Sequence, residues 1–129
     1  MKLVVQMPWE KNLSVNHMRF GPGGGYRKKP EVQAWMAELK DWVWLERRVY
    51  DGERRPMPPW PPPVALPVCV VIDFRWPNAR RTDDHNYYKI VCDSVAAGLG
   101  IDDKDIRIST GTVEIDRDTP GFTITVSDA

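Results

Sequence analysis

The run from Val64 to Trp76 constrains the fold more than any other part of the sequence. Apolar residues occupy every second position of the run, and several of the positions between them are apolar as well. Because successive side chains of a strand point to opposite faces of a sheet, the middle of this strand should be buried on both faces. The pattern therefore predicts a central strand. Its second face becomes polar at Asp73 and Arg75, next to the turn at Pro77, where a functional site can form.

A first helix is predicted before this strand. It begins at Pro30, which suits the first position of a helix, and apolar residues at helical spacing extend it to about Arg48. The residues expected to face the core are Val32, Trp35, Met36, Leu39, Trp42 and Val43.

A second helix is predicted after the strand. Thr82 or Asp83 can cap its start, and the glycines Gly98 and Gly100 are expected to end it. The residues expected to form its apolar stripe are Tyr88, Val91, Cys92 and Val95.

Shorter alternating segments predict the other strands. Residues 2–7 form the first strand, and residues 106–109, 112–116 and 122–126 follow the second helix. The order of elements predicts an α+β domain, with a mixed β-sheet and two main helices packed against it. A chain of 129 residues is long enough for one such core, so residues 1–129 are expected to form a single domain.

Two loops interrupt these elements. Residues from about 10 to 29 contain a glycine run with basic and amide side chains around it. They predict a mobile loop that either closes over a polyanion or is an ordinary surface loop. Residues from about 56 to 67 contain seven of the twelve prolines and predict a semi-rigid, exposed loop within the domain.

Hydrophobicity and cysteine usage indicate the compartment. No apolar run approaches the roughly 18 residues that a membrane span requires. The two cysteines, Cys69 and Cys92, each lie within an apolar run, which favours buried thiols in a reducing environment. We therefore expect a cytoplasmic protein with no membrane partner.

The net charge is zero, but the charges are divided along the chain. Residues 1–82 hold 14 basic and 8 acidic side chains, and residues 83–129 hold 4 and 10, so the two parts carry +6 and −6. A basic part could follow phosphates while an acidic part holds cations. The alternative is that the two parts attract each other on a mixed surface.

Acidic, basic and amide side chains gather at the start of the second helix and in the segment after it. Hydrolysis of a phosphodiester needs an activated water and neutralisation of transition-state charge, which a divalent ion held by carboxylates supplies. Asp83 and either Asp102 or Asp103 are suitable ligands, and Lys89 could balance charge at the phosphate. Two arginines before Asp83 could hold the DNA backbone. The alternative is an ordinary solvated helix start.

The joined motif reads Arg80-Arg81-x-Asp83-x-x-Asn86-x-x-Lys89, then Asp93-Ser-Val-Ala-Ala-Gly98, then Ile101-Asp102-Asp103. This pattern resembles that of RusA-like Holliday-junction resolvases. Pro8-Trp9 with Asn16, after the first strand, resembles the start of the same family.

The resemblance implies a small homodimeric, Mg²⁺-dependent endonuclease with a mixed α/β fold that cuts four-way DNA junctions in bacteria and their phages. It implies that Asp83 and Asp103 are metal ligands in the catalytic centre and that Lys89 is the catalytic lysine. Asn86 and Asp93 would support the ligands. A homodimer also suits two symmetric cuts across a junction.

One position departs from the family pattern. The family has a second aspartate where this chain has His85, and Asp84 occupies the neighbouring position. Imidazole is a poorer ligand for Mg²⁺ than for Mn²⁺ or other transition ions. Three interpretations follow: His85 is a ligand and the preference shifts toward Mn²⁺, Asp84 or Asp73 fills the gap, or catalysis is weakened and the protein mainly binds DNA. We favour the first.

Three functional hypotheses follow. The leading one is a Mg²⁺- or Mn²⁺-dependent endonuclease that cleaves branched DNA, above all Holliday junctions, in recombination, repair or phage DNA processing. The alternatives are a non-catalytic junction-binding protein with the same fold and a metal-dependent hydrolase of a smaller phosphate ester. The residues expected to contact DNA are Arg80, Arg81, Arg75, Arg27, Lys28, Lys29 and Asn16.

Overall fold

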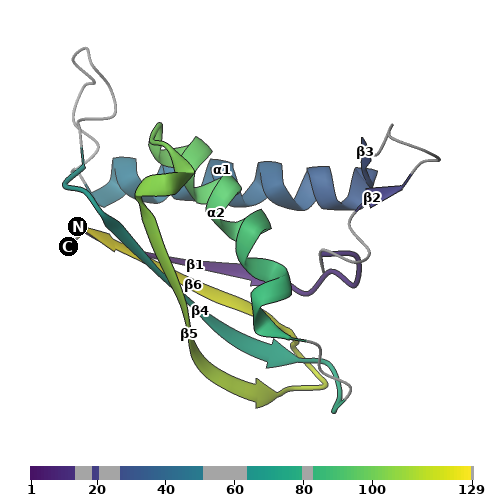
Figure 1. The fold of residues 1–129 in the computed structure, drawn as a ribbon. Coiled ribbons are helices and arrows are strands. Elements are labelled where there is room, and N and C mark those ends of the chain that lie inside the picture. The colour runs from purple at the N-terminus through teal and green to yellow at the C-terminus, as the bar shows by residue number, and fades with distance from the viewer. Residues whose placement is uncertain (14–18, 21–26, 51–63, 80–82, 129) are drawn as a thin grey trace.

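The computed structural model describes residues 1–13, 19–20, 27–50, 64–79 and 83–128. A four-stranded mixed sheet, in the order β1-β6-β4-β5, packs against helices α1 and α2 (Figure 1). This arrangement confirms the predicted α+β architecture with two main helices. The strands are β1 (Lys2–Pro8), β4 (Val68–Trp76), β5 (Ile106–Ile115) and β6 (Gly121–Asp128), and the helices are α1 (Pro30–Tyr50) and α2 (Tyr88–Leu99).

Strand β4 lies inside the sheet, antiparallel to β6 and parallel to β5, as the prediction of a central strand requires. It begins at Val68 rather than Val64, and Leu66 in the irregular segment before it is exposed. Alternate residues from Val68 to Trp76 are at most 1% exposed, whereas the residues between them are half-buried. The expectation of burial on both faces is therefore wrong, because both helices share one core with a single face of β4.

Helix α1 confirms the predicted start at Pro30 and ends close to the predicted end. The expected core position of Trp42 is wrong, because its side chain is 41% exposed. Trp42 lies about 100° around the helix from its buried neighbour Val43 and faces the outer edge of β1 instead. The buried residues of α1 are Val32, Trp35, Leu39, Val43 and Arg47.

Helix α2 follows a short 3₁₀ helix, η1 (Asp84–Tyr87), and ends at Gly100, which has a φ of 70°. The predicted end at Gly98 is wrong, because Gly98 lies inside the helix and is buried. A Cβ at this position would lie 2.8 Å from the Lys40 carbonyl oxygen and 2.9 Å from Val43 Cβ. Gly98 therefore lets α1 and α2 approach closely. The buried residues of α2 are Ile90, Val91, Ser94, Val95, Ala96, Gly98 and Leu99, while Tyr88 and Cys92 are half-buried.

Strand β5 is continuous, whereas the sequence predicts two strands with a break at residues 110–111. Its register with β4 shifts by one residue opposite Asp73. Thr112 donates to Asp73 Oδ1 from its backbone nitrogen at 2.7 Å and from its hydroxyl at 3.1 Å. A Cβ on Gly111 would overlap the Asp73 carboxylate. The apparent break is therefore a β-bulge that the Asp73 side chain fills.

Aromatic rings pack the end of β4 against η1, the short helix that precedes α2. The Tyr87 ring lies 5.8 Å from the Phe74 ring and 5.6 Å from the Trp76 ring. Trp9, just after β1, lies 4.9 Å from Trp76 and stacks on Phe122 at 5.1 Å. Such pairs contribute about 0.5–1.5 kcal/mol each beyond their buried area. They hold η1 against the end of β4.

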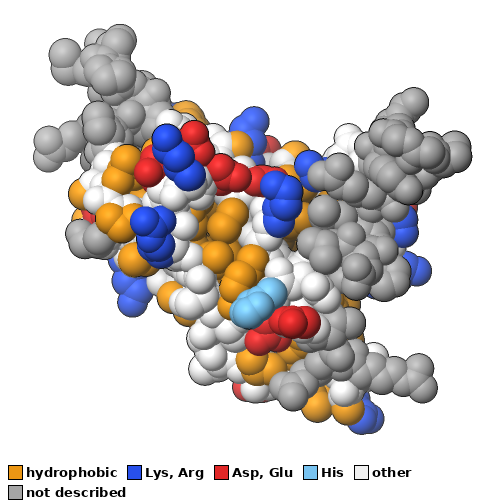
Figure 2. Space-filling view, viewed as in Figure 1, with side chains coloured by type: hydrophobic (Ala, Val, Ile, Leu, Met, Phe, Trp, Pro, Cys, Tyr) orange, Lys and Arg blue, Asp and Glu red, His pale blue; other side chains and the backbone are white. Residues whose placement is uncertain are grey.

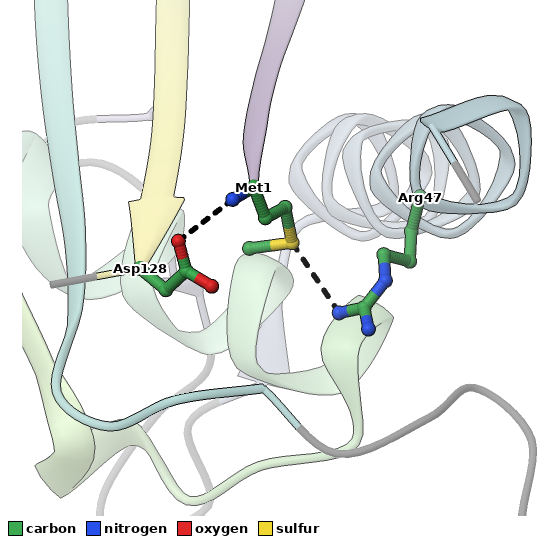
Figure 3. A network of polar contacts seen from close by, with 3 residues as sticks. All are labelled: Met1, Arg47 and Asp128. Carbon is green, nitrogen blue, oxygen red and sulfur yellow. Dashed lines mark hydrogen bonds and ion pairs between the residues drawn. The ribbon is translucent and has the colours of Figure 1, made fainter.

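Met1 joins three elements of the fold (Figure 3). Its α-amino group donates to Asp128 Oδ1 at 2.8 Å, and Arg47 Nη1 donates to Met1 Sδ at 3.3 Å. The amino group holds the pKa of Asp128 below its usual value, and the Asp128 carboxylate raises the pKa of the amino group. These contacts connect the start of β1 to the end of β6 and to the last turn of α1.

The two predicted loops are described in part. Residues 10–29 are predicted to be irregular, but Arg19–Phe20 (β2) pairs antiparallel with Arg27–Lys28 (β3). Residues 21–26 and 56–63, which hold the glycine run and most of the prolines, lie outside the described residues. In the described part of the chain, no helix is long and apolar enough to cross a membrane.

Candidate metal and phosphate site

Asp83 caps η1 and so begins the segment that carries most of the predicted site. Its backbone is extended, with φ −62° and ψ 130°, and its Oδ1 accepts from the His85 backbone nitrogen at 2.9 Å. Its carbonyl oxygen accepts from the Asn86 backbone nitrogen at 3.0 Å. Asp83 is therefore one of the two caps that the sequence predicts, and its side chain is exposed.

His85 lies between Asp83 and Tyr88. Its Nδ1 is 3.7 Å from Asp83 Oδ1, and its ring centre is 4.9 Å from that of Tyr88. The hydroxyls of Tyr88 and Thr110 are 2.6 Å apart, which ties the helix start to β5. Tyr88 and Thr110 are absent from the predicted site, although the i,i+3 spacing of His85 and Tyr88 is a usable sequence signal.

Lys89 and Asp93 form an ion pair on α2, and Asp103 lies near Asp93. Lys89 Nζ lies 3.5 Å from Asp93 Oδ2, one turn further along the helix. Asp103 begins the 3₁₀ helix η2 (Asp103–Asp105), and the side chains of Asp102 and Asp93 lie close enough to its carboxyl to raise its pKa. The acidic segment after α2 thus folds back onto α2 at Asp93, ten residues beyond Asp83.

The crowding of these carboxyls changes their proton affinities. The hydrogen bond with Asp102 is the main cause that raises the pKa of Asp103, and Asp93 adds to it. The backbone nitrogen of Lys104, 3.0 Å from Asp102 Oδ1, lowers the pKa of Asp102. Burial raises the pKa of the Cys92 thiol to about 11, so the thiol stays protonated at neutral pH and is a poor metal ligand.

The predicted metal ligands form two groups. Figure 2 shows two acidic patches on one face, with the histidine beside one of them. Asp83 and Asp93 are ten residues apart, which corresponds to about 15 Å along a helix. Within the described ranges, no three His, Cys, Asp or Glu side chains stand together as a metal site. The structure therefore does not assemble the predicted set of Asp83, His85 and Asp103.

Asp73 and Arg75 lie on the face of β4 that the helices leave uncovered. Arg75 Nη1 donates to Thr123 Oγ1 at 2.7 Å, and its Nε donates to the Thr119 carbonyl oxygen at 3.3 Å. The Asp73 carboxylate accepts a hydrogen bond from the Thr112 backbone nitrogen at the bulge in β5. The structure does not bring either side chain to the two acidic groups.

The remaining predicted residues are dispersed. Lys29 Nζ donates to Asn12 Oδ1 at 3.0 Å, and Lys28 lies half-buried in β3. Asp84 and Asn86 are half-buried in η1. Of the other residues expected to contact DNA, Arg27 is described only as part of β3, and Arg80, Arg81 and Asn16 lie outside the described residues.

The donor chemistry of both groups suits a divalent ion. Mg²⁺ binds through one or two carboxylates together with water and substrate oxygens, and the Asp93–Asp103 pair offers such a set. A cation would also relieve the repulsion between these carboxylates. Asp83 with His85 offers one oxygen and one nitrogen ligand, which suits Mn²⁺ better. Comparison of the sequence with protein-family models and with curated proteins finds no match.

Proposed function

We propose that this protein is a Mg²⁺- or Mn²⁺-dependent endonuclease that cleaves branched DNA, with four-way junctions as its preferred substrate. The observation that carries the proposal is the ion pair of Lys89 and Asp93, with Nζ 3.5 Å from Oδ2, near Asp103, whose pKa Asp93 helps to raise. All three residues belong to the motif that resembles RusA-like resolvases. Two carboxylates suited to a cation near a lysine suited to a phosphate are the combination that phosphodiester hydrolysis needs.

Asp103 and Asp93 would hold the ion, with Asp102 next to them. When bound, the ion supplies charge neutralisation at the phosphate and lowers the pKa of a coordinated water. This assignment gives Asp93 a larger role than the sequence motif implies. Asp83 and His85 remain a candidate second pair of ligands, 3.7 Å apart at the helix start.

Lys89 would contact the phosphate. Its side chain is exposed, so its ammonium can leave Asp93 for a phosphate oxygen when DNA binds. A surface pair at i,i+4 contributes only about 0.3–0.5 kcal/mol, so this exchange costs little. The same exchange would free the Asp93 carboxylate to hold the ion.

The basic residues Arg80, Arg81, Lys28 and Lys29 would hold the DNA backbone, which positions the protein without selecting a sequence. Two symmetric cuts across a junction need two sites related by a two-fold axis, so the proposed working form is a homodimer.

The test is cleavage of a synthetic four-way junction by the purified protein with Mg²⁺ or Mn²⁺. We expect paired nicks from the wild type, and a loss of rate of roughly 10²-fold or more for Lys89→Ala and for Asp103→Asn. Asp118→Asn removes an acid from the exposed turn before β6 and is the matched control, which should cleave at the wild-type rate. A wild type that cuts no junction with either ion would contradict the proposal.

A non-catalytic junction-binding protein is the second candidate. It is favoured by the finding that no group of three metal ligands stands together in the described residues. Asp83→Ala distinguishes the endonuclease from the non-catalytic binding protein. An enzyme should lose cleavage, while its affinity for the junction stays equal or becomes tighter. A binding protein should show the same binding change with no cleavage before or after the substitution. A gel-shift series on junction and linear duplex measures both.

A further inference from the structure

Strand β1 forms one edge of the sheet. It pairs with β6 on one side, and no strand among the described residues pairs with its other side. The backbone groups on that side can pair with another extended chain, as edge strands do when they bind peptides. β1 spans Lys2–Pro8, and among its residues only Pro8 has no backbone N–H. The strand therefore offers a template of seven residues for one more strand.

Helix α1 lies alongside β1 and runs in the opposite direction (Figure 1). Near its start, Trp35 Nε1 donates to the Pro8 carbonyl oxygen at 2.8 Å. Near its end, Arg47 Nη1 donates to Met1 Sδ at 3.3 Å. A strand added to the free edge of β1 would therefore lie beside one flank of α1 over the whole length of β1.

The flank of α1 next to this edge is apolar and exposed. Trp42, Leu45 and Val49 are 41%, 43% and 49% exposed, and their spacing of three and four residues puts them on one stripe. Trp42 also borders a hollow of about 230 Å³ at the edge of β1, which an apolar side chain of an added strand could enter. The residues that line this hollow are Val4, Val5, Gln6, Trp42 and Glu46.

Two acids stand on the same flank, one turn before and one turn after Trp42. Glu38 is exposed and Glu46 is half-buried, and both lie within about 40° of Trp42 around the helix. None of the ion pairs among the described residues includes either carboxylate. The flank therefore carries unbalanced negative charge beside its apolar stripe. The basic side chains of α1 lie about 120–160° around the helix from Trp42, and these are Lys40, Arg47 and Arg48.

This charge selects among the possible occupants of the edge. A nucleic acid would place its phosphates against Glu38 and Glu46, and a second copy of this chain would bring another flank with the same negative charge. A basic peptide would place opposite charges there. In an extended conformation it would also pair with the backbone of β1 and cover Trp42.

We propose that the β1–α1 edge, made of the free side of β1 with Glu38, Trp42 and Glu46, binds an extended segment of another protein with the pattern basic-x-apolar-x-basic. Side chains two residues apart in a strand point to the same face and lie about 6.8 Å apart. Glu38, Trp42 and Glu46 follow one another at about 6 Å along the helix. Three such side chains of the segment can therefore meet the first acid, the indole and the second acid. The pattern reads the same in both directions, so it suits a parallel or an antiparallel strand.

The residues between the basic and apolar positions should be uncharged. They would lie on the sheet face that the helices leave uncovered, next to the outward side chains of β1. A basic residue there would oppose Lys2, whereas threonine suits a half-exposed sheet face. The segment is therefore basic on one face only.

The test is the fluorescence anisotropy of a labelled peptide, Gly-Thr-Lys-Thr-Leu-Thr-Lys-Thr-Gly, titrated with the purified full chain. We expect saturable binding that weakens at least tenfold with Trp42→Ala and with the double variant Glu38→Lys/Glu46→Lys. Glu114→Lys makes the same charge change at an exposed position on β5, the opposite edge of the sheet, and should bind as the wild type does. Circular dichroism of each variant confirms that the chain remains folded.

A charge exchange and a backbone block test the two parts of the interaction separately. A peptide with glutamate in place of both lysines should bind the double variant more tightly than it binds the wild type. Alternate residues of a strand direct their N–H groups to the same side. Of two peptides, one N-methylated at the threonines and one at the lysines and leucine, one should therefore lose binding and the other should keep it.

A wild type that binds no peptide at about 100 µM protein, or that binds both N-methylated peptides equally, would overturn the proposal. Light scattering provides the remaining outcome. A wild-type dimer that dissociates in the double variant would assign the edge to a second copy and would also overturn it. The inference goes beyond the proposed nuclease activity and does not rest on it. Because these measurements need no DNA and no metal, their failure is distinguishable from failure of the nuclease proposal.

Discussion

The carboxyl of Asp103, in the segment after α2, lies close enough to the carboxyl of Asp93 in that helix for Asp93 to raise its pKa. Two carboxylates in contact repel each other unless a proton or a cation lies between them. The fold could avoid this cost by placing an amide at either position. Removing one of these charges and adding a cation should therefore each stabilise the fold, and the cation should stabilise it less once the charge has been removed.

Asp103→Asn should raise the thermal midpoint of the metal-free protein, because it removes one of the repelling charges. Mg²⁺ or Mn²⁺ should raise the midpoint of the wild type and should raise that of the variant much less. Differential scanning fluorimetry in EDTA and across a metal titration measures both effects. Asp118→Asn is the control and should respond to metal as the wild type does. An equal metal response in Asp103→Asn would exclude Asp103 as a ligand.

Gly98→Ala should destabilise the protein by about 1–3 kcal/mol, because the new methyl would overlap the Lys40 carbonyl oxygen and the Val43 side chain. Urea denaturation gives the free energy of unfolding. Ala97→Ser, at the exposed neighbouring position of the same helix, should change it by no more than about 0.5 kcal/mol. A neutral Gly98→Ala would mean that α1 and α2 are not in the close contact described.

Local periodicity predicts the elements well, and the exceptions share a cause. Gly98 looks like a helix end because it stands beside Gly100, and only the approach of α1 shows that it lies inside the helix. Gly111 looks like a break between two strands, and only the carboxylate of Asp73 on β4 makes it a bulge. Trp42 has helical spacing with core residues but lies beyond the edge of the sheet. Each exception depends on a neighbour that is distant in sequence.

The same limit applies to the candidate site. The Lys89–Asp93 pair follows from its i,i+4 spacing, and the Asp83 cap follows from its place before a helix. The predicted pairing of Asp83 with Asp102 or Asp103 as ligands also requires the acidic segment after α2 to return to that helix. The acidic segment lies near Asp93 and not near Asp83. Its position depends on the length of α2 before Gly100 and on how η2 packs, and the spacing of residues in the sequence specifies neither.

Stability should fall at both ends of the pH range because of the Met1–Asp128 ion pair. The pKa of Asp128 lies below its ordinary 3.8, so its contribution is present above pH 3.8 and is lost as pH falls through the lowered value. The pKa of the Met1 amino group lies above its ordinary 8.0, so its contribution is present below pH 8.0 and is lost as pH rises through the raised value.

Asp128→Asn should therefore flatten the alkaline arm of a urea-denaturation series and reduce the acid arm. Asp116→Asn is the matched control. The pKa of Asp116 is also lowered, mainly by the Thr119 backbone nitrogen, so this variant should reduce the acid arm and leave the alkaline arm unchanged. An alkaline arm that persists in Asp128→Asn would assign that loss of stability to another group.

The final prediction separates a structural role of Asp73 from a role in metal binding. Asp73→Ala should destabilise the protein by about 0.5–1.5 kcal/mol, because it removes the acceptor that the exposed backbone nitrogen of Thr112 has at 2.7 Å. Asp73→Asn keeps an oxygen at the same position and should cost less. Both variants should keep the wild-type rise in thermal midpoint with Mg²⁺ or Mn²⁺, because Asp73 lies on the sheet face away from α2. A metal response that disappears in both variants would instead make Asp73 a ligand and would require β4 to present its uncovered face to the ion.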